Sequence, residues 1–353
     1  MAAQKRFLST PATLTLFIIL IVAACGFLAL RALQAPKVYN QDTTLFAMGL
    51  ANPVDNRLHD GFIDADADLV ADPPEDSAQW IDPDVLMFSY VASAEGDAGY
   101  AQVWSEFIKH LEETTGKKVN YLKLNSPEEM LIALKAGKLH AAGLNTGGVP
   151  IAVNDCGFIP FCTPGNEGGQ IGYTMKIIVP KDSELTDVRD LDGRTLTLTH
   201  KGSNSGYKAP LVILMNNFGL QPERDFYTRK SPGHDASIRG IADGTYEAAA
   251  IASDLLQRAI GRGEVTEDQV RVLYESERFV SAAIGHLHNL NPELAESIRN
   301  ACANFEWSGT GLVKEFGSAG ADRFVPVDYK NDWALVRHID NAIGYRHVVE
   351  MGE

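Results

Sequence analysis

The sequence has few basic residues for its length. Lys and Arg together number 31 against 46 Asp and Glu, which gives a formal net charge of −15 over 353 residues. A nucleic-acid partner would select a basic face, so this balance argues against nucleic-acid binding. It does not argue against a small anionic ligand, because a local site can be positive within an acidic protein. The length is enough for two domains, and 45% hydrophobic residues can form a buried core.

Motifs that carry catalysis are also missing. The sequence has no P-loop, no nucleophile and base at an interpretable spacing, and no convincing metal-ligand cluster. His286 and His288 alternate as on a strand without a third ligand, so we interpret them as structural. We therefore expect a protein that is not an enzyme and that needs no cofactor and no metal ion.

Only one apolar run is long enough to cross a membrane. Residues 12–30 carry no charge and follow Lys5 and Arg6. About 20 apolar residues span a bilayer, and signal-peptide cores are shorter. We therefore expect residues 1–11 in the cytoplasm and the body exported, and we favour an uncleaved anchor over a cleaved signal. An alternative is a lipoprotein, because "VAAC" ending at Cys25 resembles a lipidation box.

Cysteines are scarce, with four in the whole chain. Cys156 and Cys162 bracket "GFIPF" and could form a disulfide in an oxidising compartment, although the sequence leaves the required geometry open. Cys302 has the spacing of a buried helix face, and we expect it to be free.

Residues 31–84 differ in composition from the rest and predict an acidic, solvated linker. Within them, residues 64–75 place carboxylates at positions 1, 3, 5, 9 and 12, the ligand spacing of a calcium loop. Leu69 replaces the glycine that such a loop needs for its turn, and Pro73 and Pro74 would block the following helix. We therefore favour a plain acidic tether.

From residue 85 onward, apolar runs of strand length alternate with helical periodicity, and this order predicts an α/β fold with parallel sheets. Two such series follow one another. We expect a first lobe in residues 85–176, a second in 177–276, and completion of the first by 277–353. Ligands of such sheets bind beyond the carboxyl ends of the strands. The polar or aromatic residues at those positions are Tyr90, Asn145, Thr146, Ser203, Asn204, Ser205, His234 and Asp254.

Several ordered motifs resemble one family. They include "MLIALKAGKLHAAGLN", "VPKDSELTDVRDLDGRTLTLTHKGSNSGY" and "PGHDASIRGIADGTYEAAAIASD". The chain over residues 85–344 is similar to the phosphonate and phosphite substrate-binding proteins of bacterial ABC importers. The resemblance implies a two-lobed type II periplasmic-binding-protein fold with the ligand in the cleft. It also implies a phosphorus oxyanion as ligand, an ABC permease of the inner membrane as partner, and a periplasmic location tethered to that membrane.

The resemblance also implies roles for individual residues. The family's Ser-Thr-Ser-Gly anion turn matches Ser203, Asn204, Ser205 and Gly206, so Asn204 replaces a threonine. The family's histidine, acidic residue and first-strand aromatic match His234, Asp254 and Tyr90. The loop "NTGGVP", which holds Asn145 and Thr146, departs from the family's usual aromatic and proline. Both departures concern the identity of the ligand.

The turn suits an oxyanion for physical reasons. The first amides of a helix have no internal partner and lie at the positive end of the helix dipole. Ser203 and Ser205 would add hydroxyl donors, while His234 could also donate and Asp254 could accept a proton or pair with an ammonium. An ordinary helix cap is the alternative interpretation of the turn. A membrane-tethered ligand sensor for a signalling partner is the alternative function, and neighbouring permease or kinase genes would distinguish the two functions.

Overall fold

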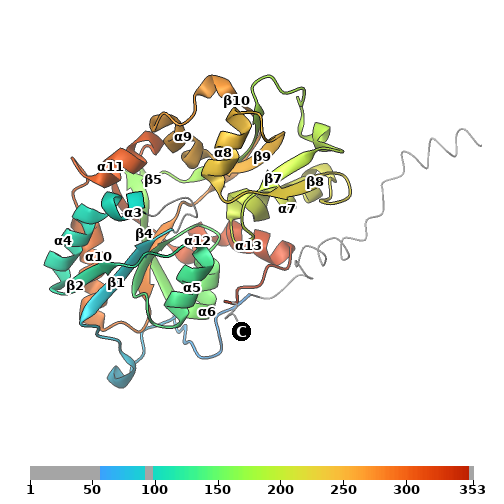
Figure 1. Cartoon of the computed structure of the whole chain (residues 1–353). Helices are drawn as coiled ribbons and strands as arrows, with labels where there is room; N and C mark the ends of the chain where they lie inside the picture. The colour runs from blue at the N-terminus through green and yellow to red at the C-terminus, as the bar shows by residue number, and fades with distance from the viewer. Residues whose placement is uncertain (1–55, 92–97, 350–353) are drawn as a thin grey trace, which may run out of the picture. The chain divides into compact units, whose positions relative to one another are not determined.

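The computed structural model describes residues 56–91 and 98–349 (Figure 1). The expected anchor at residues 12–30 and the lipidation candidate Cys25 lie outside this range. Within the described part of the chain, none of the helices combines the length and the apolar character needed to cross a bilayer.

The first sheet holds seven strands in the order β12-β4-β11-β3-β1-β2, with β5 paired to β4. β1, β2 and β3 run parallel, whereas β11 and β12 run antiparallel to their neighbours. The bounds are β1 Val85–Tyr90, β2 Lys118–Tyr121, β3 Ala141–Leu144, β4 Phe158–Asn166, β5 Gly169–Gln170, β11 Ala283–Leu287 and β12 Arg323–Pro326.

The second sheet has five strands in the order β10-β6-β9-β7-β8. The bounds are β6 Tyr173–Pro180, β7 Thr195–Leu198, β8 Tyr227–Lys230, β9 Ala248–Ala252 and β10 Val270–Phe279. β8, β7 and β9 are parallel, but β6 and β10 are antiparallel. The expectation of parallel sheets is therefore correct for the central βα units of both sheets. It is wrong for the other strands, because every pairing of β4, β5, β6, β10, β11 and β12 is antiparallel.

Helices cover both faces of each sheet (Figure 1). In the first sheet α4 packs with α10, and α5 packs with α6; in the second, α8 packs with α9 and α7 lies against β6. Ser126 caps α5, because its Oγ accepts a hydrogen bond from the amide of Glu129 at 3.2 Å. The bounds are α3 Ala98–Val103, α4 Ser105–Thr115, α5 Pro127–Lys135, α6 Val149–Cys156, α7 Ala209–Phe218, α8 His234–Ala242, α9 Ser253–Gly261, α10 Pro292–Asn304, α11 Gly311–Phe316, α12 Tyr329–Asp332 and α13 Ala334–Ala342.

The described part of the expected linker, residues 56–84, is mostly exposed, but specific contacts hold it against the body. Residues 56–84 pack on the first-sheet side: the amide of His59 donates to Asn154 O, and Ala71 is buried. The Phe62 ring lies edge-on against His288 at 4.8 Å between centroids. These few apolar and backbone contacts follow no period, so composition alone could not reveal the docking.

Asp64, Asp66 and Asp68 form the one group of three potential metal ligands among the described residues. Asp66 and Asp68 are exposed. The oxygens of the group accept hydrogen bonds from the amides of Asp68, Leu69 and Val70 within the same loop. These hydrogen bonds stabilise the loop within the docked segment, residues 56–84.

The Cys156–Cys162 disulfide is absent, and Cys156, Cys162 and Cys302 are free and buried. Cys156 ends α6, and the chain then continues as the extended strand β4 up to Cys162. Four strand residues cover about 13 Å, beyond the reach of a disulfide. The neighbour of Cys162 is instead Cys302 on α10, whose thiol hydrogen-bonds with it.

Candidate functional site

A cavity of about 450 Å³ is lined by residues of both sheets and their loops. It contains every sequence-predicted site residue except Gly206, which lies within the adjoining turn. The predicted residues that line it are Tyr90, Asn145, Thr146, Ser203, Asn204, Ser205, His234 and Asp254. The structure therefore brings together side chains that are up to 164 positions apart in the sequence, since Tyr90 and Asp254 share this one cavity.

The predicted anion turn is a buried π-helical turn, Asn204–Lys208, that continues directly into α7. Ser203 caps it, because its Oγ accepts a hydrogen bond from the amide of Gly206 at 3.0 Å. A Cβ on Gly206 would lie only 2.1 Å from Thr199 Oγ1, so the tight turn requires glycine here. Ser203 caps the helix and also lines the cavity. The two interpretations of the turn, a helix cap and a ligand site, are therefore compatible.

His234 fixes the direction of the Ser203 hydroxyl. The amide of Ala252 donates to His234 Nδ1 at 3.3 Å, so Nδ1 is an acceptor and the proton of the neutral ring is on Nε2. Nε2 lies 3.1 Å from Ser203 Oγ and therefore donates to it. With two donors already directed at Ser203 Oγ, its own proton is left to be donated elsewhere, and the cavity is beside it.

The imidazole of His234 stays neutral near pH 7. Burial, with a smaller contribution from the neighbouring His200, lowers the pKa of His234 to about 3. Part of the side chain faces the cavity, but both ring nitrogens are hydrogen-bonded within the protein. His234 therefore supports Ser203 in this structure, whereas the sequence suggested that it would itself donate to the oxyanion.

Two acceptor oxygens at the cavity have no hydrogen-bond partner among the described residues, Asn204 Oδ1 and Asp254 Oδ1, and both are buried. The Asn204 amide donates through Nδ2 to the Tyr173 hydroxyl at 3.0 Å. Burial raises the pKa of Asp254, with Arg258 opposing the shift. Buried acceptors without partners are costly, so a ligand that brings its own donors would be favoured here.

The Asn145–Gly148 loop follows β3 and meets the anion turn. Asn145 Nδ2 donates to Gly202 O at 3.5 Å, and Thr146 Oγ1 donates to Val280 O at 2.9 Å. Tyr90, at the end of the neighbouring strand β1, is buried against Trp104 with ring centroids 4.4 Å apart. The loop thus presents polar groups to the cavity, and Tyr90 forms part of its aromatic wall.

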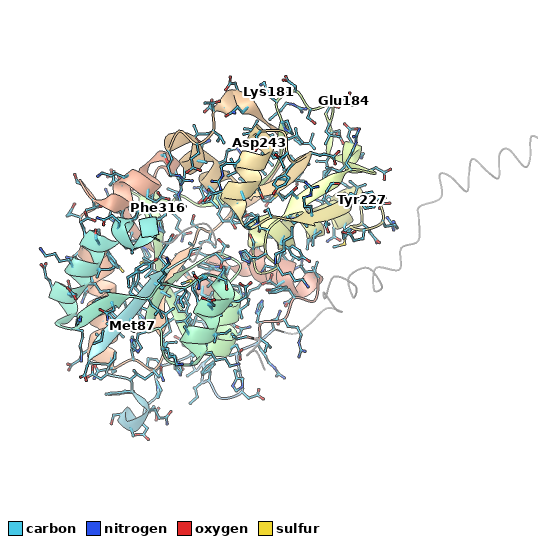
Figure 2. The ribbon with its side chains drawn as sticks, viewed as in Figure 1. Met87, Lys181, Glu184, Tyr227, Asp243 and Phe316 are labelled. Atoms are coloured by element: carbon cyan, nitrogen blue, oxygen red, sulfur yellow. The ribbon has the colours of Figure 1, made fainter. Side chains whose placement is uncertain are left out.

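Sequence reasoning missed several residues of the cavity. Tyr173 starts β6, where the chain passes from one sheet to the other, and burial raises its pKa to about 12, so its hydroxyl remains a donor. Arg258 lines the cavity and forms an ion pair with Glu315 of α11, while its guanidinium stacks on Phe316 (labelled in Figure 2) at 4.7 Å. An aromatic residue at the start of a crossing strand was a usable signal for Tyr173. Arg258 has no local signal, because its partner is 57 positions away.

Comparison with known proteins gives the family. Residues 90–333 match the family described as ABC transporter, phosphonate, periplasmic substrate-binding protein, which is more than half of the chain. The chain belongs to this family. This phosphonate-family protein is thus a periplasmic substrate-binding component of an ABC transporter, a transport protein and not an enzyme.

Relatives of this family member are distant in sequence. A phosphate-import protein, PhnD, of Mycolicibacterium smegmatis is 22% identical over 80% of this chain and 90% of its own length. The solved binding protein of a Pseudomonas aeruginosa phosphonate transporter has a TM-score of 0.63 at 19% identity, over 73% of this chain and 86% of that one. PhnD1 of Prochlorococcus marinus, solved with methylphosphonate, has a TM-score of 0.65 at 14% identity, over 75% and 100%. The two structures support the fold of this family member, a mixed α/β fold with two sheets.

Proposed function

We propose that the protein binds an organophosphonate in this cavity, with the phosphonate oxygens on the Ser203–Gly206 turn. The observation that carries the proposal is the buried helix start at the cavity, where the Ser203 proton is left over for a ligand oxygen. Helix amides and neutral hydroxyls are suited to a small oxyanion that has lost its water.

The size of the cavity supports a ligand with an organic group. A volume of about 450 Å³ lies in the range of sites for organic ligands, whereas a bare oxyanion would leave most of it to water. Ile171, Leu255 and Phe316 give part of the lining an apolar character suited to a carbon substituent. The methylphosphonate bound to PhnD1 is a ligand of this chemical class, and the M. smegmatis relative makes phosphate the competitor to test.

Calorimetric titration of the full-length chain in detergent tests this function. We expect methylphosphonate and a longer alkylphosphonate to bind, with the longer compound at least as tight as phosphite. Sulfate should fail, because at neutral pH it has no proton for the buried oxygens of Asp254 and Asn204. Binding of phosphate alone would contradict the organophosphonate, and the absence of binding by every phosphorus oxyanion would contradict the ligand class.

Asp254 provides a second prediction, because its unpartnered Oδ1 suits a protonated ligand oxygen or an ammonium. Asp254→Asn should weaken alkylphosphonate binding about tenfold, the value of one hydrogen bond to a charged group. Asp243→Asn, which changes an exposed carboxylate at the end of α8, is the control and should leave affinity unchanged. Tighter binding by Asp254→Asn would mean that the carboxylate only repels the anion.

We further propose two lobes built on the two sheets, with boundaries close to 176/177 and 276/277. Support comes from β6, which begins at Tyr173, and β10, which ends at Phe279, since these strands enter and leave the second sheet. A membrane tether through residues 12–30, or through a lipid on Cys25, is also part of the proposal. Its support is the uncharged apolar run and the basic residues before it.

A further inference from the structure

A buried ammonium group connects the anion turn to the opposite side of the cavity. Lys208 ends the π-helical turn of the second-sheet side, and its side chain is 0% exposed. Its Nζ donates to Gly147 O, in the loop after β3 of the first sheet, at 3.1 Å. The same atom lies 2.6 Å from Asp340 Oδ1 of α13 and 4.5 Å from the centre of the Tyr345 ring.

The counter-charge of Lys208 is held in turn by neutral groups. Asn154 Nδ2 lies 2.9 Å from His347 Nδ1 and can only donate to it, so the His347 proton is on Nε2 and is donated to Asp340 Oδ2 at 2.8 Å. The amide of His347 donates to Asn56 Oδ1 of the docked N-terminal segment at 2.9 Å. The buried Lys208 ammonium is therefore paired with the buried Asp340 carboxylate through Oδ1, and Asp340 Oδ2 accepts a hydrogen bond from His347.

The contact between the two sides depends on glycine at position 147. A Cβ there would lie 2.3 Å from Gly202 O and 2.8 Å from the amide nitrogen of Asn204. Both of these atoms are backbone and belong to the anion turn or the residues just before it. The loop and the turn can meet this closely only because residue 147 has no side chain.

A second carbonyl of the loop is fixed by a side chain as well. Trp333 Nε1 donates to Thr146 O at 3.0 Å, next to the Gly147 carbonyl that accepts from Lys208. Asn145 and Thr146 of this loop line the cavity together with Ser203, Asn204 and Ser205 of the turn. Lys208 itself is not among the lining residues. It ends the turn that carries Ser203, Asn204 and Ser205, and its ammonium contacts the backbone of the loop that carries Asn145 and Thr146.

We propose that Lys208, Asp340 and Gly147 form a clamp that holds the Asn145–Gly148 loop and the Ser203–Gly206 turn in one arrangement around the ligand. Lys208 is then a positioning residue, not a ligand contact. The part of the inference that concerns affinity rests on the proposed function. A substrate-binding protein binds more tightly when its two groups of ligand-binding residues are correctly positioned before the ligand arrives. A larger fraction of the free protein is then in the conformation that can bind.

Two variants test the clamp. Lys208→Met combined with Asp340→Asn removes both charges together, so that no unpaired charge stays buried. Gly147→Ala leaves both charged side chains in place and separates loop from turn, with the new Cβ also 3.1 Å from Lys208 Cε. Lys176→Met with Glu275→Gln is the matched control, because it removes a partly buried ion pair, with N and O 3.6 Å apart, that lies within the second sheet alone.

Affinity for methylphosphonate, the thermal midpoint and amide hydrogen exchange are measured on the full-length chain. In both clamp variants we expect about tenfold weaker binding. Exchange should accelerate at residues 145–148 and 203–208 in the absence of methylphosphonate, while the thermal midpoint stays within a few degrees of the control pair. Exchange that accelerates throughout the first sheet would mean a purely structural role, and unchanged exchange and affinity would overturn the clamp. If the wild-type chain binds no phosphorus oxyanion, the proposed function fails, and the exchange measurement still decides the clamp.

Discussion

Replacing Ser203 and Ser205 together by alanine should weaken phosphonate binding by more than 100-fold. Each hydroxyl is positioned at the start of a helix beside the cavity, and a hydrogen bond to a charged oxygen contributes about 1.5–3 kcal/mol. Two such losses add to about 3–6 kcal/mol, while every 1.4 kcal/mol changes affinity tenfold. Calorimetry with methylphosphonate on the full-length variant measures the effect.

Ser203 is also a helix cap, so its loss has a second effect that must be separated. Removing a cap costs about 1 kcal/mol of stability. Asn291→Ala is the control, because Asn291 caps the distant helix α10 by accepting from the amide of Glu293. We expect similar shifts in thermal midpoint for Asn291→Ala and Ser203→Ala, with lost affinity in the serine variant alone. If the double serine variant keeps its affinity, the turn is an ordinary cap.

Acidification should destabilise the fold by several kcal/mol between pH 6.5 and pH 4. Burial lowers the pKa of His286 to about 4, whereas the ordinary value of 6.5 applies in the unfolded chain. Below pH 6.5 the unfolded chain therefore binds a proton that the folded chain refuses, and stability falls as the pH falls. At pH 4.5 this amounts to about 2.5 kcal/mol for His286. His234 adds in the same direction, though less than its pKa of about 3 suggests, since one side of the ring faces the cavity.

Urea unfolding of wild type and His286→Gln at pH 7 and pH 4.5 isolates this contribution. Glutamine can still accept the hydrogen bond that Arg299 Nε donates to His286 Nε2 at 3.2 Å, but it does not titrate. The difference in unfolding free energy between the two pH values should be smaller in the variant by about 2 kcal/mol. An identical pH dependence in the two proteins would mean that His286 is protonated in the fold.

Much of the fold was predictable because its signals are local. The apolar run before Tyr90 is β1, Ser126 caps α5, and the residues after β7 form a tight turn where glycine is required. These assignments depend on periodicity, capping and turn chemistry, which a single sequence displays. The direction of β6 and β10 is set by the crossing between the sheets, and this information is not local.

Some residues of the candidate site could likewise be predicted from local sequence, and others could not. Ser203 and Asp254 lie within five positions of the ends of β7 and β9, so the rule for sheet edges found them. In the sequence, nothing distinguishes Lys208 from an ordinary lysine of a helix. Only the structure shows that its amine forms an ion pair with Asp340, 132 positions later. The neighbours of Cys162 and the docking of residues 56–84 also depend on tertiary packing, and composition favoured other interpretations for both.

The order of strands in the first sheet has a consequence for how the chain folds. β11 lies between β3 and β4, although more than a hundred residues separate it from either strand. During export, β3 and β4 therefore expose bare edges until residues 283–287 emerge, whereas all strands of the second sheet come from the continuous segment 173–279. The half that carries the serine turn can assemble early, and the other half remains open to edge-to-edge aggregation until the chain is nearly complete.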